Sequence, residues 1–147
     1  MANHISHSET DSVLGLKANN TRYNFYCVDD SSFLLKVIVR MLDDFKGNVL
    51  GSTIKSKDAL AYIQENSDII DIVTLDIHMP EMNGIELLHE IKKINPNIKV
   101  IMVSAVGDIE RVKQTLKLGA SHFIVKPFNK DKAFPILKFV CGTVVNG

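Results

Sequence analysis

The stretch Ile69-Ile-Asp-Ile-Val-Thr-Leu-Asp76-Ile-His-Met-Pro-Glu-Met-Asn-Gly84 decides the fold that we predict for this chain. Its first seven residues are apolar except for Asp71 and Thr74, and they are rich in β-branched side chains, which is typical of a buried strand. A loop with proline and glycine follows, and an amphipathic segment begins at Ile85. Asp76 therefore lies at the carboxyl end of a predicted strand, where open parallel α/β sheets form their ligand crevices.

Similar strand patterns alternate with helical patterns along the chain. The predicted strands are 23–28, 48–53, 69–75, 98–103 and 122–125. Segments with apolar residues at helical spacing follow each of them, beginning near Ser31, Ser56, Ile85, Asp108 and Asn129. Five strands alternating with five helices predict right-handed βαβ units and a parallel α/β sheet that is covered on both faces.

Polar residues and glycine mark the ends of the predicted helices. Ser31-Ser32 is expected to cap the first helix, and Gly47 is expected to end it at the C′ position. Ser56 is expected to cap the second helix. Pro135 falls inside the segment predicted for the last helix, where proline removes a hydrogen bond beyond the first turn. We therefore expect this helix either to start late, near Phe134, or to be kinked.

The composition is that of one ordinary globular domain. With 147 residues, 46% of them hydrophobic, the chain is long enough to bury a substantial core. Its 17 basic and 17 acidic residues balance, which gives no electrostatic footprint for nucleic acid. Cys27 falls inside a predicted strand and is far along the chain from Cys141, so we expect a buried free thiol rather than a disulfide or metal site.

The amino-terminal region carries no targeting or membrane-spanning pattern. No apolar stretch approaches the roughly 18 residues that span a bilayer, and the basic and apolar regions of a signal peptide are absent. We therefore expect a cytoplasmic protein without membrane contact. Residues 1–22 are polar and are expected to form a flexible leader to a domain at 23–147. The alternative is a short helix from Glu9 to Ala18 that docks on the domain or on a partner.

Five polar side chains are expected to meet at one edge of the sheet. Asp29, Asp30 and Asp76 would crowd three anions together, so either one is protonated or a cation lies among them. Hard carboxylate oxygens favour Mg²⁺, with Mn²⁺ as the alternative occupant. Lys126 and Ser104 end two further strands and would add an ammonium group and a hydroxyl. Such a set suits a phosphoryl group carried on a carboxylate as an aspartyl phosphate.

Four motifs carry a resemblance to a known family. They are Cys-Val-Asp29-Asp30-Ser-Ser, Leu-Asp76-Ile-His-Met-Pro-Glu-Met-Asn-Gly84, Val-Ser104-Ala105 and Val-Lys126-Pro127-Phe128. In this order they resemble the receiver domain of bacterial response regulators, from about residue 23 to residue 140. The resemblance implies a flavodoxin-like, doubly wound sheet with the strand order 2-1-3-4-5.

The resemblance also implies a role for each motif residue. Asp76 would be the phosphoacceptor, and Lys126 would pair with the phosphoryl group. Asp30 would bind Mg²⁺ directly, Asp29 would help partly through water, and Ile77 would contribute its backbone carbonyl. Ser104 and Phe123 would act as the switch. His78 and Val106 would influence how long the phosphoryl group survives.

The function implied by the resemblance is phosphorylation-dependent signalling. The chain reaches Gly147 without an output domain, which predicts a stand-alone receiver that takes a phosphoryl group from a histidine kinase or a histidine phosphotransfer protein. It would catalyse its own phosphorylation and the slow hydrolysis of its aspartyl phosphate, without being a conventional enzyme. Output would pass through the face formed by 108–118, 122–125 and 129–140, to a partner or a second copy.

Two other functions are alternatives to this one. The first is an adaptor that keeps the fold and binds its partner without phosphorylation; the presence of the complete set of site residues argues against it. The second is a metal-dependent phosphatase with an aspartyl nucleophile, which expects a second Asp at the position of His78. The cognate kinase, the output partner and the pathway stay open, with chemotaxis, a phosphorelay and stress signalling as alternatives.

Overall fold

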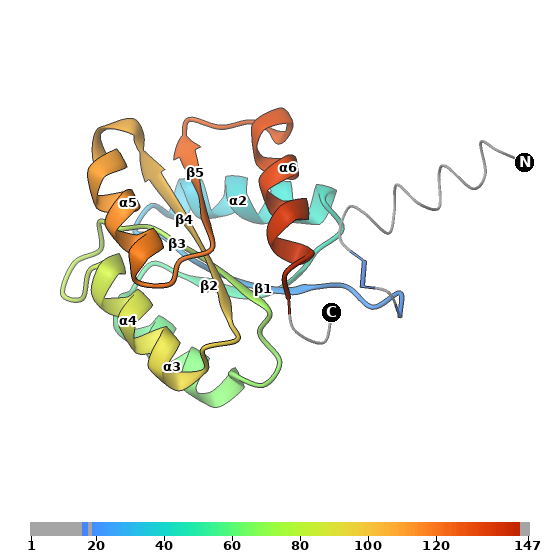
Figure 1. Cartoon of the computed structure of the whole chain (residues 1–147), viewed down its shortest axis with the longest axis horizontal. Helices are drawn as coiled ribbons and strands as arrows, with labels where there is room; N and C mark the ends of the chain where they lie inside the picture. Colours follow the sequence, from blue (N-terminus) through green and yellow to red (C-terminus); the bar gives the residue numbers. More distant parts are fainter. Residues whose placement is uncertain (1–15, 18, 145–147) are drawn as a thin grey trace, which may run out of the picture.

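A five-stranded parallel sheet forms the centre of the computed structural model, which describes residues 16–17 and 19–144 (Figure 1). The strands are β1 (Asn24–Val28), β2 (Asn48–Thr53), β3 (Ile72–Leu75), β4 (Lys99–Ala105) and β5 (His122–Lys126). Their order is β2-β1-β3-β4-β5, and each neighbouring pair is parallel. The predicted doubly wound fold is confirmed. Most of the expected leader, residues 1–15 and 18, lies outside the described residues.

Helices cover both faces of this sheet. They are α2 (Ser32–Asp44), α3 (Ser56–Asn66), α4 (Gly84–Ile94), α5 (Ile109–Lys117) and α6 (Lys130–Cys141), with a 3₁₀ turn at Val106–Asp108 before α5. Buried residues of α3, α4 and α5 pack on one face of the sheet, and those of α2 and α6 pack on the other. Figure 1 shows these two layers on opposite sides of the strands. None of the described helices is long and apolar enough to cross a bilayer.

The alternation of side chains along β3 explains its mainly apolar pattern. Ile72 belongs to the core under α2 and α6, whereas Val73 and Leu75 belong to the core under α3, α4 and α5. A strand buried on both faces favours apolar residues at nearly every position, as expected for a parallel sheet, and Thr74 is the polar exception in β3. The same burial accounts for Cys27 and Cys141, which are both buried free thiols.

The end of α2 differs from the prediction by one residue. Ser31 caps the start as expected, since its side chain accepts a hydrogen bond from Leu34 N–H at 3.1 Å. At the other end Lys46, not Gly47, takes the left-handed C′ conformation, with φ at 70°. The Gly47 N–H then donates to the Leu42 carbonyl at 2.9 Å, which completes a Schellman motif. Gly47 is needed for space instead, because a Cβ there would lie 2.6 Å from the ring of Phe25.

Two further expectations about helix ends are wrong. The N-cap of α3 is Lys55, which makes no side-chain cap, and Ser56 is the first helical residue. The Ser56 hydroxyl instead donates to the Pro80 carbonyl at 3.3 Å and ties α3 to the loop after β3. Of the two alternatives for Pro135, the late start of α6 is the wrong one: the Asn129 side chain caps the helix by accepting from Lys132 N–H at 3.0 Å, and Pro135 lies inside it. The kink stays a prediction.

Candidate functional site

Three carboxylates meet at the carboxyl ends of two neighbouring strands. Asp29 and Asp30 follow β1, Asp76 follows β3, and these two strands pair with each other. One oxygen from each carboxylate lies within 4.8 Å of the other two. Asp29 is fully buried and Asp76 is 4% exposed, whereas Asp30 is exposed. The cluster therefore has two anions in the interior and a third at its mouth.

Backbone contacts fix these carboxylates in place. The Asp76 N–H donates to the Val28 carbonyl at 3.1 Å, which continues the pairing of β3 with β1. Asp29 Oδ1 accepts a hydrogen bond from Ser31 N–H at 2.9 Å. Gly84 makes room for the end of β3, because a Cβ at this position would lie 2.1 Å from the Asp76 carbonyl oxygen. The glycine that ends the Asp76 motif is thus required by the backbone that carries the carboxylate.

Lys126 brings a positive charge into the cluster from the end of β5. Its Nζ lies 3.1 Å from Asp29 Oδ2 and 3.6 Å from Asp76 Oδ2. Burial is the main cause that raises the pKa of Asp76 to about 6; the charge of Asp29 raises it further, while Lys126 opposes the rise. Three carboxylates against one ammonium group leave an excess of negative charge, which attracts a cation.

The donor set fits a hard divalent cation. Carboxylate oxygens without a nearby histidine or cysteine ligand are the donors that Mg²⁺ and Mn²⁺ prefer. The backbone carbonyl of Ile77, expected to be a further ligand, is also engaged in the loop after β3. Its carbonyl oxygen accepts a hydrogen bond from Gly84 N–H at 2.8 Å, in the turn that begins α4. A carbonyl oxygen has two lone pairs, so this bond leaves one of them free, and the role of Ile77 as a metal ligand stays a prediction.

Ser104, expected to act as the switch hydroxyl, is held by a residue that the sequence analysis missed. Ser104 is buried at the end of β4, and its hydroxyl donates to Asp108 Oδ2 at 3.4 Å. The other oxygen of Asp108 lies 2.8 Å from His78 Nε2. Asp108 therefore joins the loop that follows Asp76 to the loop that follows Ser104. An Asp at a predicted helix start is ordinarily a cap, so no sequence pattern singles it out.

The two remaining candidates are Phe123, in β5, and Val106, in the 3₁₀ turn before α5. Phe123 is partly buried and packs against the core under α3, α4 and α5. Val106 is 70% exposed at the start of the 3₁₀ turn. The structure thus places the expected site residues at one edge of the sheet, while their roles stay predictions.

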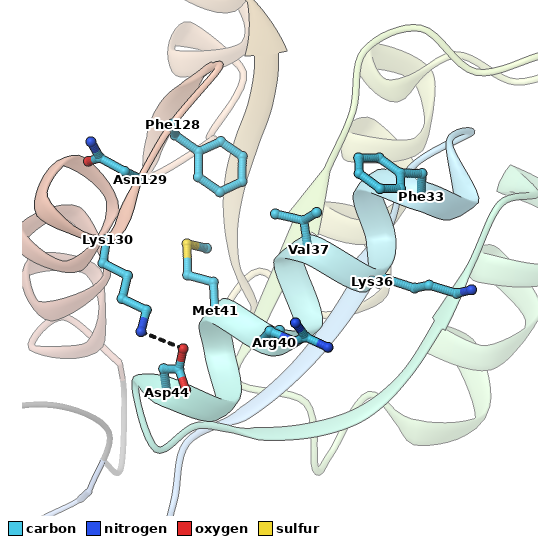
Figure 2. A pocket seen from close by; sticks show the side chains of 9 residues that line it. All are labelled: Phe33, Lys36, Val37, Arg40, Met41, Asp44, Phe128, Asn129 and Lys130. Atoms are coloured by element: carbon cyan, nitrogen blue, oxygen red, sulfur yellow. Dashed lines mark ion pairs between the residues drawn. The ribbon is translucent and has the colours of Figure 1, made fainter.

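An apolar groove of about 500 Å³ lies between α2 and the start of α6. Its apolar lining comes from Phe33, Val37, Met41 and Phe128, as Figure 2 shows. Phe33 is 76% exposed and comes three residues after Asp30. Lys36 and Arg40 supply positive charge, and Lys130 pairs with Asp44 across the groove (Figure 2). The groove is therefore apolar, with charged residues at its border.

Comparison with known proteins decides the family. Residues 25–138 match the family model described as the response regulator receiver domain. The chain belongs to the response regulator receiver family. It is 38% identical to the chemotaxis protein CheY of Treponema pallidum over 118 residues, which is 80% of this chain and 82% of that protein. It is 39% identical to CheY of Thermotoga maritima over 113 residues, or 77% and 92% of the two chains.

A solved receiver supports the same assignment. CheY in the CheX-CheY-BeF₃-Mg²⁺ complex from Borrelia burgdorferi superposes with a TM-score of 0.81 at 32% sequence identity. The match covers 91% of this chain and 99% of that one. The receiver family and the CheY-like fold of this chain are therefore shown by sequence and by structure together.

Proposed function

We propose that this receiver accepts a phosphoryl group on Asp76 from a histidine kinase or a histidine phosphotransfer protein, with Mg²⁺ bound. The observation that carries the proposal is the position of Lys126 Nζ, which lies within 4 Å of carboxylate oxygens on both Asp29 and Asp76. An ammonium group fixed beside a buried carboxylate suits the charge that gathers on a transferring phosphoryl group. The Borrelia CheY, solved with BeF₃ and Mg²⁺, supports the same reading for this chain.

The proposed transfer uses the chain's own groups as follows. A carboxylate oxygen of Asp76 attacks phosphorus, the P–N bond of the phosphohistidine breaks, and the imidazole leaves with the electron pair. Lys126 pairs with a phosphoryl oxygen, and Asp29 and Asp30 hold the cation. When bound, Mg²⁺ neutralises phosphoryl oxygens in the same crevice. The domain thereby catalyses its own phosphorylation. Slow attack of water on phosphorus then breaks the bond to the Asp76 oxygen, releases inorganic phosphate and restores the carboxylate.

Output is proposed to pass through the face of α5, β5 and α6. Ser104 would turn from Asp108 to the phosphoryl group, and Phe123 would repack into the space that it leaves. This face presents an exposed aromatic side chain, Phe139, whose ring lies 6.0 Å from that of His122. A downstream protein or a second copy of the chain would bind there. The proposed place of action is the cytoplasm.

The groove beside α2 is the proposed docking surface for the phosphodonor. The exposed side chain of Phe33 lines this groove, and Phe33 follows Asp30 by three residues in the sequence. The basic side chains Lys36 and Arg40 suit a partner surface with acidic residues. Replacing Phe33 with Ala is expected to slow transfer from the cognate phosphodonor while leaving phosphorylation by a small molecule unchanged.

Incubation with acetyl phosphate tests the proposed function. With Mg²⁺, intact-mass measurement is expected to show the gain of one phosphoryl group, and removal of the cation with EDTA is expected to prevent it. A chain that binds a partner but never gains this mass would instead be a phosphorylation-independent adaptor. That outcome would overturn the proposal.

A further inference from the structure

Asp108 uses both oxygens of its carboxylate to bridge two loops at the edge of the site. Oδ1 lies 2.8 Å from His78 Nε2, and Oδ2 lies 3.4 Å from Ser104 Oγ. His78 follows Asp76, the proposed phosphoacceptor, by two residues, and Ser104 is the last residue but one of β4. The bridge therefore connects a residue of the β3–α4 loop to the hydroxyl at the end of β4.

An ordinary capping role does not explain Asp108. It occupies the N-cap position of α5, yet its side chain accepts no hydrogen bond from the backbone of that helix. The side chain is 17% exposed, so it is largely withdrawn from solvent as well. Its pKa is lowered, chiefly by the hydrogen bond with His78, which keeps it ionised. An ionised carboxylate only accepts hydrogen bonds, so His78 Nε2–H and the Ser104 hydroxyl are both donors.

The Ser104 hydroxyl carries one proton and can donate it to one acceptor at a time. In this structure the acceptor is Asp108 Oδ2. If Ser104 donates to a phosphoryl oxygen on Asp76, as the proposed function requires, it must first leave Asp108. Asp108 and the phosphoryl group therefore compete for the same proton.

We infer that Asp108 is a positioning residue that retains the Ser104 hydroxyl in the unphosphorylated state and holds His78 beside the phosphorylation site. The inference rests on the proposed function, because the competition exists only if a phosphoryl group forms on Asp76. Asp108 thereby favours the inactive arrangement, and phosphorylation releases Ser104 while His78 keeps its partner. The carboxylate of Asp108 thus contacts residues of both segments, His78 after β3 and Ser104 near the end of β4.

The test replaces Asp108 with Ala and measures the affinity of the Mg²⁺-loaded protein for beryllofluoride by NMR titration. Removing the Asp108 carboxylate is expected to tighten beryllofluoride binding by on the order of threefold to tenfold. The charge-assisted hydrogen bond from Ser104 to Asp108 then no longer has to break before Ser104 can donate to the ligand. Damage to the fold would weaken binding instead. Asp108→Asn, which keeps the size and one acceptor oxygen, is expected to give a smaller gain.

Two further variants separate the bridge from a general charge effect. Glu110→Ala removes an acid two residues away whose side chain is 89% exposed, and it is expected to leave the affinity unchanged. In a Ser104→Ala background, Asp108→Ala is expected to give no gain, because there is no hydroxyl proton to release. A gain that persists without Ser104, or that Glu110→Ala reproduces, would overturn the inference.

A second readout reports on His78 without any phosphoryl mimic. At fixed pH, the imidazole nitrogen signals of the unaltered protein are expected to show the Nε2–H tautomer, and Asp108→Ala is expected to change them. Unchanged His78 signals, or unchanged affinity in a protein that does bind beryllofluoride, would refute the role of Asp108. If the unaltered protein binds no beryllofluoride, the proposed function fails first and the inference is overturned with it.

Discussion

Replacing Asp76 with Asn is expected to stabilise the protein in the absence of metal. Asp76 is 4% exposed, and burial is the first cause of its raised pKa. A rise from the ordinary value of 3.8 to about 6 corresponds to about 3 kcal/mol of unfolding free energy. The folded state binds the Asp76 proton more tightly than the unfolded chain does, so ionising this group at higher pH destabilises the fold. Asn keeps the shape of the side chain and removes the charge.

The pH dependence of this effect has a definite sign. Below about pH 4 Asp76 is protonated in both states, and the variant is expected to match the unaltered protein. Between about pH 4 and about pH 6 the unfolded chain ionises while the folded protein keeps its proton, so the advantage of the variant grows across this window. Above about pH 6 the extra stability of Asp76→Asn is expected to stay constant. The attraction of Lys126 at 3.6 Å already opposes the rise in pKa and is included in the estimate of about 3 kcal/mol.

Urea denaturation in EDTA, repeated across pH, is the assay. Glu110→Gln serves as the control, because its side chain is 89% exposed and its charge is screened by solvent, so its effect is expected to stay within about 0.5 kcal/mol. Added Mg²⁺ should narrow the gap, since it binds the folded unaltered protein and stabilises it by mass action. A variant no more stable than the unaltered protein at about pH 8, or an advantage that does not change with pH, would contradict the reasoning.

Three further outcomes follow from the geometry of the site. Asp30→Ala is expected to remove most of the Mg²⁺-induced rise in melting temperature, because it takes one of the three carboxylates from the cluster; an undiminished rise would exclude Asp30 as a ligand. Gly84→Ala is expected to destabilise the fold by more than about 2 kcal/mol in urea, since the new Cβ would lie 2.1 Å from the Asp76 carbonyl oxygen, and an unchanged midpoint would refute this. His78→Ala is expected to change the rate at which phosphorylated protein loses its phosphoryl group, and equal rates would count against its role.

The sheet and the acidic cluster were predictable because their patterns are local and repeated. A run of apolar residues that ends in Asp76, and another that ends in Asp29-Asp30, place carboxylates at the same edge once the strands are parallel and adjacent. The adjacency itself came from the family resemblance. Lys126 and Ser104 end two other apolar runs and could be placed by the same argument.

The errors arose where a residue's partner is distant or its backbone is unusual. Lys46 adopts a positive φ that is unusual for lysine, so the sequence pattern predicted Gly47, and not Lys46, at the C′ position of α2. Ser56 resembles a cap, but its partner is the Pro80 carbonyl in another loop. Asp108 also resembles a cap, and its true contacts, Ser104 and His78, come together only in the folded chain. Such long-range contacts leave no periodic pattern in the sequence.

Locating the phosphoryl group is the most direct test of the central claim. The protein is incubated with acetyl phosphate and Mg²⁺, and peptide mass spectrometry then identifies the modified residue in the unaltered chain and in Asp76→Asn. We expect modification of the peptide that contains Asp76 and no modification of the variant. Full modification of Asp76→Asn, or a phosphoryl group on a different residue of the unaltered protein, would contradict the account.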